Sequence, residues 1–235
     1  MKRFVRRTLK HFGFEIRRIE TIRTLMGFIT DRNIDVVLDV GANVGQFGAS
    51  LRAQGYRGRI VSYEPISTVY QTLAVNTATD LEWDINNFAL GLKTESATIN
   101  VSVSSEFSSI LPSTCAATKY DDAAAVTGSE LIEVRKLDDV FPEPSGNTLL
   151  KIDTQGYERQ VLEGGRSLLP KLKGVLMELP IVHLYQGTWQ FHEAIAFMAD
   201  AGFVPAQIHP VNFHSTDRVS LIEVCLLYTS PSPRD

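Results

Sequence analysis

The residues with the clearest chemistry lie in one glycine-containing run, residues 38–47, which reads LDVGANVGQF. Gly41 allows the backbone to turn sharply and to approach a ligand, and Gly45 allows a helix to pack closely on a strand. Free N–H groups at the start of that helix favour an anionic group, such as a carboxylate. Asp39, just before the first glycine, suits the ammonium group of a methionine moiety. This run therefore predicts a cofactor-binding turn.

The same turn departs from the fingerprint of a dinucleotide site. That fingerprint is G-x-G-x-x-G, but Asn43 stands at its second glycine and Gln46 at its third. Since the second glycine admits a pyrophosphate, its absence favours a ligand without one. Glu64 follows 23 residues after Gly41 and can accept two ribose hydroxyls; the alternative is an acid that caps the helix after Pro65. We expect S-adenosyl-L-methionine, with an NAD-dependent oxidoreductase or a non-catalytic cofactor-binding module as alternatives.

Candidate catalytic groups lie in the second half of the chain. A methyl donor would have to be aligned with its acceptor, and a base would have to take the acceptor's proton. Asp153 ends a predicted strand and is the first choice of base, although it could instead cap the helix that starts near Gly156. Glu178 ends another apolar strand, where a carboxylate is costly unless it binds something. His183 is the alternative base because its usual pKa is near neutrality, although a lone histidine is more often structural.

Three further side chains are candidates for the acceptor site. Glu158 lies in the first turn of a predicted helix, where any acid is favoured by the helix dipole. Tyr185 follows in a loop that should face the same cleft, and Ser109 lies in a long polar loop. Asp153 with Glu178 could offer oxygen ligands to Mg²⁺. No compact cluster of acids and histidines supports that site, so we predict no metal.

The elements that must position these residues alternate between strands and helices, as in a doubly wound parallel sheet. Two segments that alternate by twos interrupt the order and predict an inserted antiparallel hairpin, with a flexible lid or loop at 104–129 between them. A final strand pair should close the domain. The predicted strands are 35–40, 58–64, 82–90, 97–103, 131–136, 148–153, 174–179, 203–209 and from 219 onward, with helices at 44–54, 67–76 and about 191–201.

Charge is distributed unevenly along the chain. Residues 1–23 carry a net charge of +6 and the rest −10, so we expect no nucleic-acid partner. Residues 1–31 predict a basic helical extension, with one helix to about His11 and another from about Glu20 to Thr30. It either packs on the domain or makes a peripheral membrane contact through residues 1–23.

The cysteines form no disulfide or metal pattern, and no membrane span or signal peptide is visible. We therefore expect a cytoplasmic protein, with the inner face of the membrane as the alternative site.

The last eleven residues, 225–235, read CLLYTSPSPRD. This string matches the in-frame translation of a transposase-library sequencing adapter. We therefore expect a non-native tail at 225–235 and a domain at 32–224; the alternative is a genuine Ser/Pro-rich tail.

Several blocks together resemble the FkbM-type methyltransferases, from about residue 35 to 224. The most specific is KIDTQGYE, followed by a strand that ends in glutamate. The resemblance implies a Rossmann-like class I fold, with a seven-stranded, mostly parallel sheet whose last strand is antiparallel. It also implies S-adenosylmethionine as donor and a hydroxyl of a sugar, glycolipid or polyketide as acceptor. The blocks are 39–47, 63–65, 87–91, 137–139, 149–165 and 176–187.

Carried over by position, the resemblance implies which residues hold the cofactor. Asn87, Phe88 and Ala89 would lie beside the adenine, and the remaining contacts would come from Asp39, Gly41, Asn43, Gly45 and Glu64. The chain departs from the family at its end. There the usual acidic residue after 223–224, with the strand that continues from it, is replaced by the suspected adapter.

Overall fold

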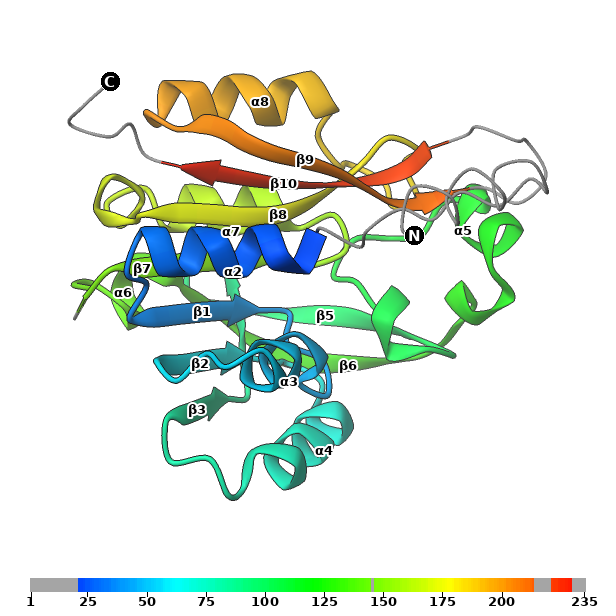
Figure 1. Ribbon diagram of the computed structural model, residues 1–235. Coiled ribbons are helices and arrows are strands. Elements are labelled where there is room, and N and C mark those ends of the chain that lie inside the picture. Colours follow the sequence, from blue (N-terminus) through cyan, green and yellow to red (C-terminus); the bar gives the residue numbers. More distant parts are fainter. Residues whose placement is uncertain (1–20, 145, 214–220, 230–235) are drawn as a thin grey trace, which may run out of the picture.

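The computed structural model describes residues 21–144, 146–213 and 221–229, and it is built around one seven-stranded sheet (Figure 1). The strand order is β3-β2-β1-β7-β8-β10-β9. The β1–β2, β1–β7, β2–β3 and β7–β8 pairs are parallel, and β10 is antiparallel to both β8 and β9. This confirms the predicted fold class. The strands are β1 Val36–Val40, β2 Arg59–Tyr63, β3 Trp83–Asn86, β7 Thr148–Ile152, β8 Gly174–Pro180, β9 Val204–Phe213 and β10 Leu221–Thr229.

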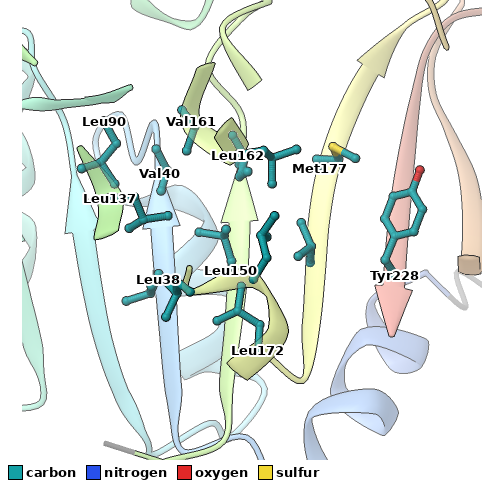
Figure 2. Packing of buried hydrophobic residues seen from close by; sticks show 14 of the residues in the cluster. Leu38, Val40, Leu90, Leu137, Leu150, Val161, Leu162, Leu172, Met177 and Tyr228 are labelled. Atoms are coloured by element: carbon teal, nitrogen blue, oxygen red, sulfur yellow. The ribbon is translucent and has the colours of Figure 1, made fainter. Parts of the chain in front are cut away.

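The central strands are apolar because both of their faces are covered. All five residues of β1 and all five of β7 are buried, as expected for parallel strands between two helical layers. On one face, Leu38, Val40 and Leu150 pack against Val161 and Leu162 (Figure 2). Alternate residues of the same strands pack on the other face.

Helices cover both faces of the sheet. Phe28, Leu51 and Leu73 pack on one face, and they come from α2 Thr21–Asp31, α3 Gln46–Ala53 and α4 Ser67–Thr77. The opposite face is covered by α6 Leu137–Val140, α7 Glu158–Gly164 and α8 Phe191–Asp200. A short helix, η3 Leu169–Lys171, follows α7. The two layers leave the carboxyl ends of the parallel strands at one edge, where α/β proteins bind ligands.

A second sheet of three strands replaces the expected end of the third strand. The strand expected at 82–90 is divided, because β3 ends at Asn86 and the chain then enters β4 Ala89–Gly91. β4 pairs in parallel with β6 Val126–Lys136, which forms the predicted antiparallel hairpin with β5 Glu95–Ser102. The predicted loop at 104–129 contains η1 Ser105–Phe107, α5 Cys115–Tyr120, η2 Asp122–Ala124 and the first residues of β6.

Both ends of the described chain bear on earlier expectations. α2 matches the second predicted N-terminal helix, whereas the first lies outside the described residues. None of the helices in the described ranges has the length and apolarity of a transmembrane span. β10 continues to Thr229, with Leu227 and Tyr228 buried, so residue 224 is not a structural boundary. Whether residues 225–235 are native stays a prediction.

Candidate active site

The turn after β1 depends on its glycines. Gly41 has φ +74°, and a Cβ there would lie 1.9 Å from the carbonyl oxygen of Asp153. Gly45 has φ +93°, and a Cβ there would lie 2.9 Å from Leu73 Cδ1 on α4. Gly41 thus lets the ends of β1 and β7 approach each other, and Gly45 lets α4 pack on the start of α3. Asn43 also adopts a positive φ of +50°, where asparagine is tolerated better than most residues.

Glu64 lies at the end of β2 and is only 5% exposed. Its Oε2 accepts a hydrogen bond from the backbone N–H of Asn43 at 3.0 Å, and its Oε1 accepts one from that of Ile66 at 2.9 Å. Burial raises the pKa of Glu64 to about 7, although these two N–H groups oppose the rise. The turn and the predicted ribose-binding acid are therefore joined directly.

Asp39 is not where we expected it to act. Its side chain is fully buried and does not line the cavity described below. Its Oδ1 lies 3.1 Å from Lys151 Nζ, and its Oδ2 accepts from Ser62 Oγ at 3.3 Å. Because Asp39 and Lys151 are register partners on β1 and β7, the lysine occupies the position that we expected for a ligand ammonium.

Asp153 follows β7 and is held by its neighbours. Gln155 Nε2 donates to its Oδ1 at 2.9 Å, and Lys151 Nζ lies 3.7 Å from its Oδ2. Gln155 has φ +52° and Gly156 has φ +99°, so the chain turns back tightly after the strand. The side chain of Asp153 is 30% exposed, which leaves it accessible to a ligand.

A cavity of about 450 Å³ lies at the carboxyl ends of β1, β2 and β7. It brings together the glycine turn after β1, the predicted ribose-binding residue Glu64 and the predicted base Asp153. Of the three residues expected beside the adenine, it includes Ala89. The predicted site residues that line it are Gly41, Asn43, Glu64, Ala89, Asp153 and Glu178. Those that do not line it are Asp39, Gly45, Asn87, Phe88, Ser109, Glu158, His183 and Tyr185.

Two of the residues expected beside the adenine have structural contacts instead. Asn87 Nδ2 donates to the carbonyl oxygens of Glu64 and Pro65, both at 3.0 Å, and so supports the end of β2. The ring centroid of Phe88 lies 5.6 Å from that of Tyr63, and the guanidinium of Arg135 lies 4.2 Å from the Phe88 centroid. Phe88 is therefore used in packing between the two sheets, and of the expected group only Ala89 lines the cavity.

Glu158 begins α7 as predicted, but it caps the preceding turn. Its Oε1 accepts from the backbone N–H groups of Thr154 and Gly156 at 3.1 and 3.0 Å. Among the residues that the structure describes, its Oε2 has no hydrogen-bond partner. Burial raises the pKa of Glu158 to about 7, against the effect of these N–H groups.

Ser109 and Tyr185 connect the segment 104–129 to the turn that follows β7. Ser109 Oγ donates to the carbonyl oxygen of Gln155 at 2.7 Å. Tyr185 O–H is placed to donate to Phe107 O at 2.9 Å or to Gln155 Oε1 at 3.1 Å. His183 Nδ1 is hydrogen-bonded to Thr188 Oγ1, so this ring contacts its own loop. Ser109 and Tyr185 act on Gln155, which in turn holds Asp153.

Several residues of the site were missed from the sequence. Lys151 could have been suspected, because a lysine inside the otherwise apolar run TLLKI must find a partner. Gln155 lies within the block KIDTQGYE, but nothing in that block indicates its contact with Asp153, and Ser105 carries no comparable signal. Ser105 Oγ lies 3.1 Å from Asn43 Oδ1, and Gln46 Nε2 donates to Glu106 Oε1 at 3.1 Å, which places η1 over the cofactor turn. Within the described ranges, no three acids, histidines or cysteines are placed to hold a metal ion.

Comparison with known proteins identifies a family. The profile of the "Methyltransferase FkbM domain" matches residues 39–205, well over half of the chain. No curated protein matches the chain. Among solved structures, precorrin-6y C5,15-methyltransferase from Geobacter metallireducens is 10% identical with a TM-score of 0.50, over 92% of this chain and 90% of that one. A putative S-adenosylmethionine-dependent methyltransferase from Listeria monocytogenes is 9% identical with a TM-score of 0.50, over 88% and 100%. These structural likenesses show the fold alone.

Proposed function

The chain belongs to the FkbM family of S-adenosylmethionine-dependent methyltransferases, and we propose that it methylates a hydroxyl oxygen of a glycan, glycolipid or natural-product acceptor. The observation that carries the proposal is the position of Asp153. Its partly exposed carboxylate lines the same cavity as the glycine turn and Glu64, and Gln155 fixes its orientation.

The donor half of the cavity has features that fit the cofactor. Each oxygen of Glu64 accepts one backbone N–H and keeps a lone pair for a ribose hydroxyl. The absence of a side chain at Gly41 lets the turn after β1 approach the backbone of Asp153 after β7, and Ala89 lines the same cavity as Glu64. When bound, S-adenosylmethionine supplies a methyl group on a positively charged sulfur, an electrophile that needs no further activation.

The acceptor half needs a group that takes the hydroxyl proton. Asp153 is the carboxylate that we assign to this role, because an ionised carboxylate accepts a proton and the Gln155 amide holds it in one orientation. Glu178 lines the same cavity, and we assign it to binding of the acceptor. His183 is the weaker candidate for the base, since it does not line the cavity.

The variant Asp153→Asn tests this proposal. Asparagine keeps the shape but cannot accept the proton, so we expect methyl transfer from labelled cofactor to a panel of hydroxyl acceptors to fall about 100-fold or more. Binding of S-adenosylhomocysteine, followed by calorimetry, should change far less than turnover, because S-adenosylhomocysteine has no acceptor proton to lose. Asp84→Asn removes a carboxylate from a surface ion pair with Arg59 and serves as the control. Full turnover by Asp153→Asn would reject the assignment of the base, and methylation of amines alone would reject the acceptor class.

We also propose that the basic segment 1–23, with a net charge of +6, brings the enzyme to an anionic membrane surface from the cytoplasmic side. A glycolipid acceptor would be presented there. Co-sedimentation with vesicles that contain anionic lipid, compared with neutral vesicles, tests this. Equal sedimentation with both would contradict it.

A further inference from the structure

We propose that Lys151 binds the methionine carboxylate of S-adenosylmethionine, and that Asp39 is the buried counter-ion of this lysine rather than a ligand for the cofactor. The inference rests on the cofactor part of the proposed function and is independent of the acceptor. It differs from the expectation from sequence, in which Asp39 binds the ammonium group of the methionine moiety. Here Lys151, a cation, contacts the carboxylate of that moiety instead.

The position of Lys151 supports this role. It lies on β7 in the centre of the sheet, its side chain is 10% exposed, and it lines the cavity together with Gly41 and Asn43. Its Nζ donates to Gly41 O at 3.1 Å and lies 3.1 Å from Asp39 Oδ1. Asp153 Oδ2 is 3.7 Å away, beyond hydrogen-bond length. The ammonium group is therefore anchored on the protein side and carries a third proton.

The side chain of Lys151 is protonated. Burial lowers the pKa of this lysine, but the nearby carboxylates of Asp39 and Asp153 outweigh that effect and raise it above its usual value. The side chain therefore stays a cation at neutral pH. In the wall of a partly apolar cavity, an N–H of this ammonium group can donate a charge-assisted hydrogen bond to a carboxylate oxygen of the donor.

The carboxylate of Asp39 contacts other protein groups and not the cavity. Its two oxygens face Lys151 and Ser62, and its side chain is shielded from the cavity. A ligand ammonium placed beside this pair would meet the like charge of Lys151 first. The carboxylate is the only anionic group of the donor, so Lys151 selects that group.

A purely structural role does not explain the ion pair between Asp39 and Lys151. A buried ion pair adds little stability compared with apolar residues of similar volume, because both charges must be desolvated. Here the pair lies one residue from the carboxyl ends of two fully buried strands, and its cationic member is at the cavity wall. Binding of an anionic ligand explains why the charge is placed there.

The test compares two ligands that differ only in the carboxylate: S-adenosylhomocysteine and its decarboxylated analogue. We expect calorimetry with the wild-type chain to show at least tenfold tighter binding of S-adenosylhomocysteine. In Lys151→Met, S-adenosylhomocysteine should fall to the affinity of the analogue, whose own affinity should change less than threefold. Lys171→Met removes a lysine from an exposed pair with Glu143 and should leave both affinities unchanged.

Lys151→Met leaves Asp39 buried without its partner, so the double variant Asp39→Asn/Lys151→Met provides a chain without either charge. It should bind both ligands equally. Equal binding of the two ligands by the wild-type chain would overturn the inference alone, as would an equal loss for both in the variants. No binding of either ligand by the wild-type chain would overturn the cofactor assignment and this inference together.

Discussion

Gly41 and Asp153 directly follow the neighbouring strands β1 and β7, and a Cβ on Gly41 would come within 1.9 Å of the carbonyl oxygen of Asp153. The turn that should hold the donor and the residue that should take the acceptor proton are therefore in direct contact through their backbones. Because the clashing atom belongs to the backbone at a strand end, it cannot rotate away. Any side chain at position 41 must separate β1 from β7 or distort the turn.

Gly41→Ala is expected to impair both stability and cofactor binding. The positive φ and the backbone clash should together lower the free energy of unfolding by roughly 3 kcal/mol. Affinity for S-adenosylhomocysteine should fall at least tenfold, as measured by calorimetry on the folded fraction. Gly55→Ala is the matched control, since Gly55 also has a positive φ of +98° but no atom lies within 4 Å of its added Cβ. It should cost about 1–2 kcal/mol and leave affinity unchanged.

Glu64 should make cofactor binding depend on pH. Its pKa is raised to about 7 by burial, and a ribose hydroxyl donates best to the ionised carboxylate. Affinity for S-adenosylhomocysteine should therefore rise with pH, by about tenfold between pH 6 and pH 8. Glu64→Gln should bind more weakly and show no rise. If the same slope persists in Glu64→Gln, another group titrates.

Glu158 should make stability depend on pH in the opposite sense to most carboxylates. Its folded-state pKa is raised from 4.5 to about 7, so the folded protein keeps a proton that the unfolded chain has lost. Its contribution is fully present below pH 4.5 and is lost as pH rises through 7, on the order of 3 kcal/mol in total. Denaturant unfolding at several pH values should show a smaller decline for Glu158→Gln than for the wild-type chain. An identical decline would exclude Glu158 as its source.

Tyr185→Phe should affect turnover more than donor binding. The hydroxyl contacts Phe107 O and Gln155 Oε1, and Gln155 orients Asp153. Its loss should cost about 1 kcal/mol of stability and lower kcat several-fold, with affinity for S-adenosylhomocysteine within about twofold. Tyr70→Phe, on α4 and outside the cavity lining, is the control. A loss of donor affinity equal to the loss of kcat would show that Tyr185 supports the donor half instead.

The features that sequence predicted well are local ones. Gly41, Asn43 and Glu64 follow from a strand, a turn and a fixed spacing to the next strand end, and all three line the cavity. The doubly wound, seven-stranded sheet follows from the alternating elements and from the family resemblance. The features that were missed depend on which strands become neighbours. Lys151 meets Asp39 only because β1 pairs with β7 in that register, across more than a hundred residues.

Phe88 shows that the orientation of a side chain where one strand ends and the next begins could not be predicted from sequence. The run from Trp83 to Leu90 is continuous in pattern, so nothing in it marks where β3 ends and β4 leaves for the second sheet. That division turns Phe88 toward Tyr63 and Arg135 instead of the cavity. Orientation at such a crossing depends on tertiary contacts that periodicity does not encode.

The strand order has a consequence for synthesis of the chain. β9 precedes β10 in sequence, but β10 lies between β8 and β9 in the sheet. β9 therefore has no neighbour in that sheet until β10 has inserted beside β8. On the ribosome, β9 emerges first and waits with its hydrogen-bonding edge exposed, as does the edge of β8. Unpaired edges recruit other chains, so a chain in which β10 has not yet inserted exposes the edges of two strands to aggregation and to chaperone binding.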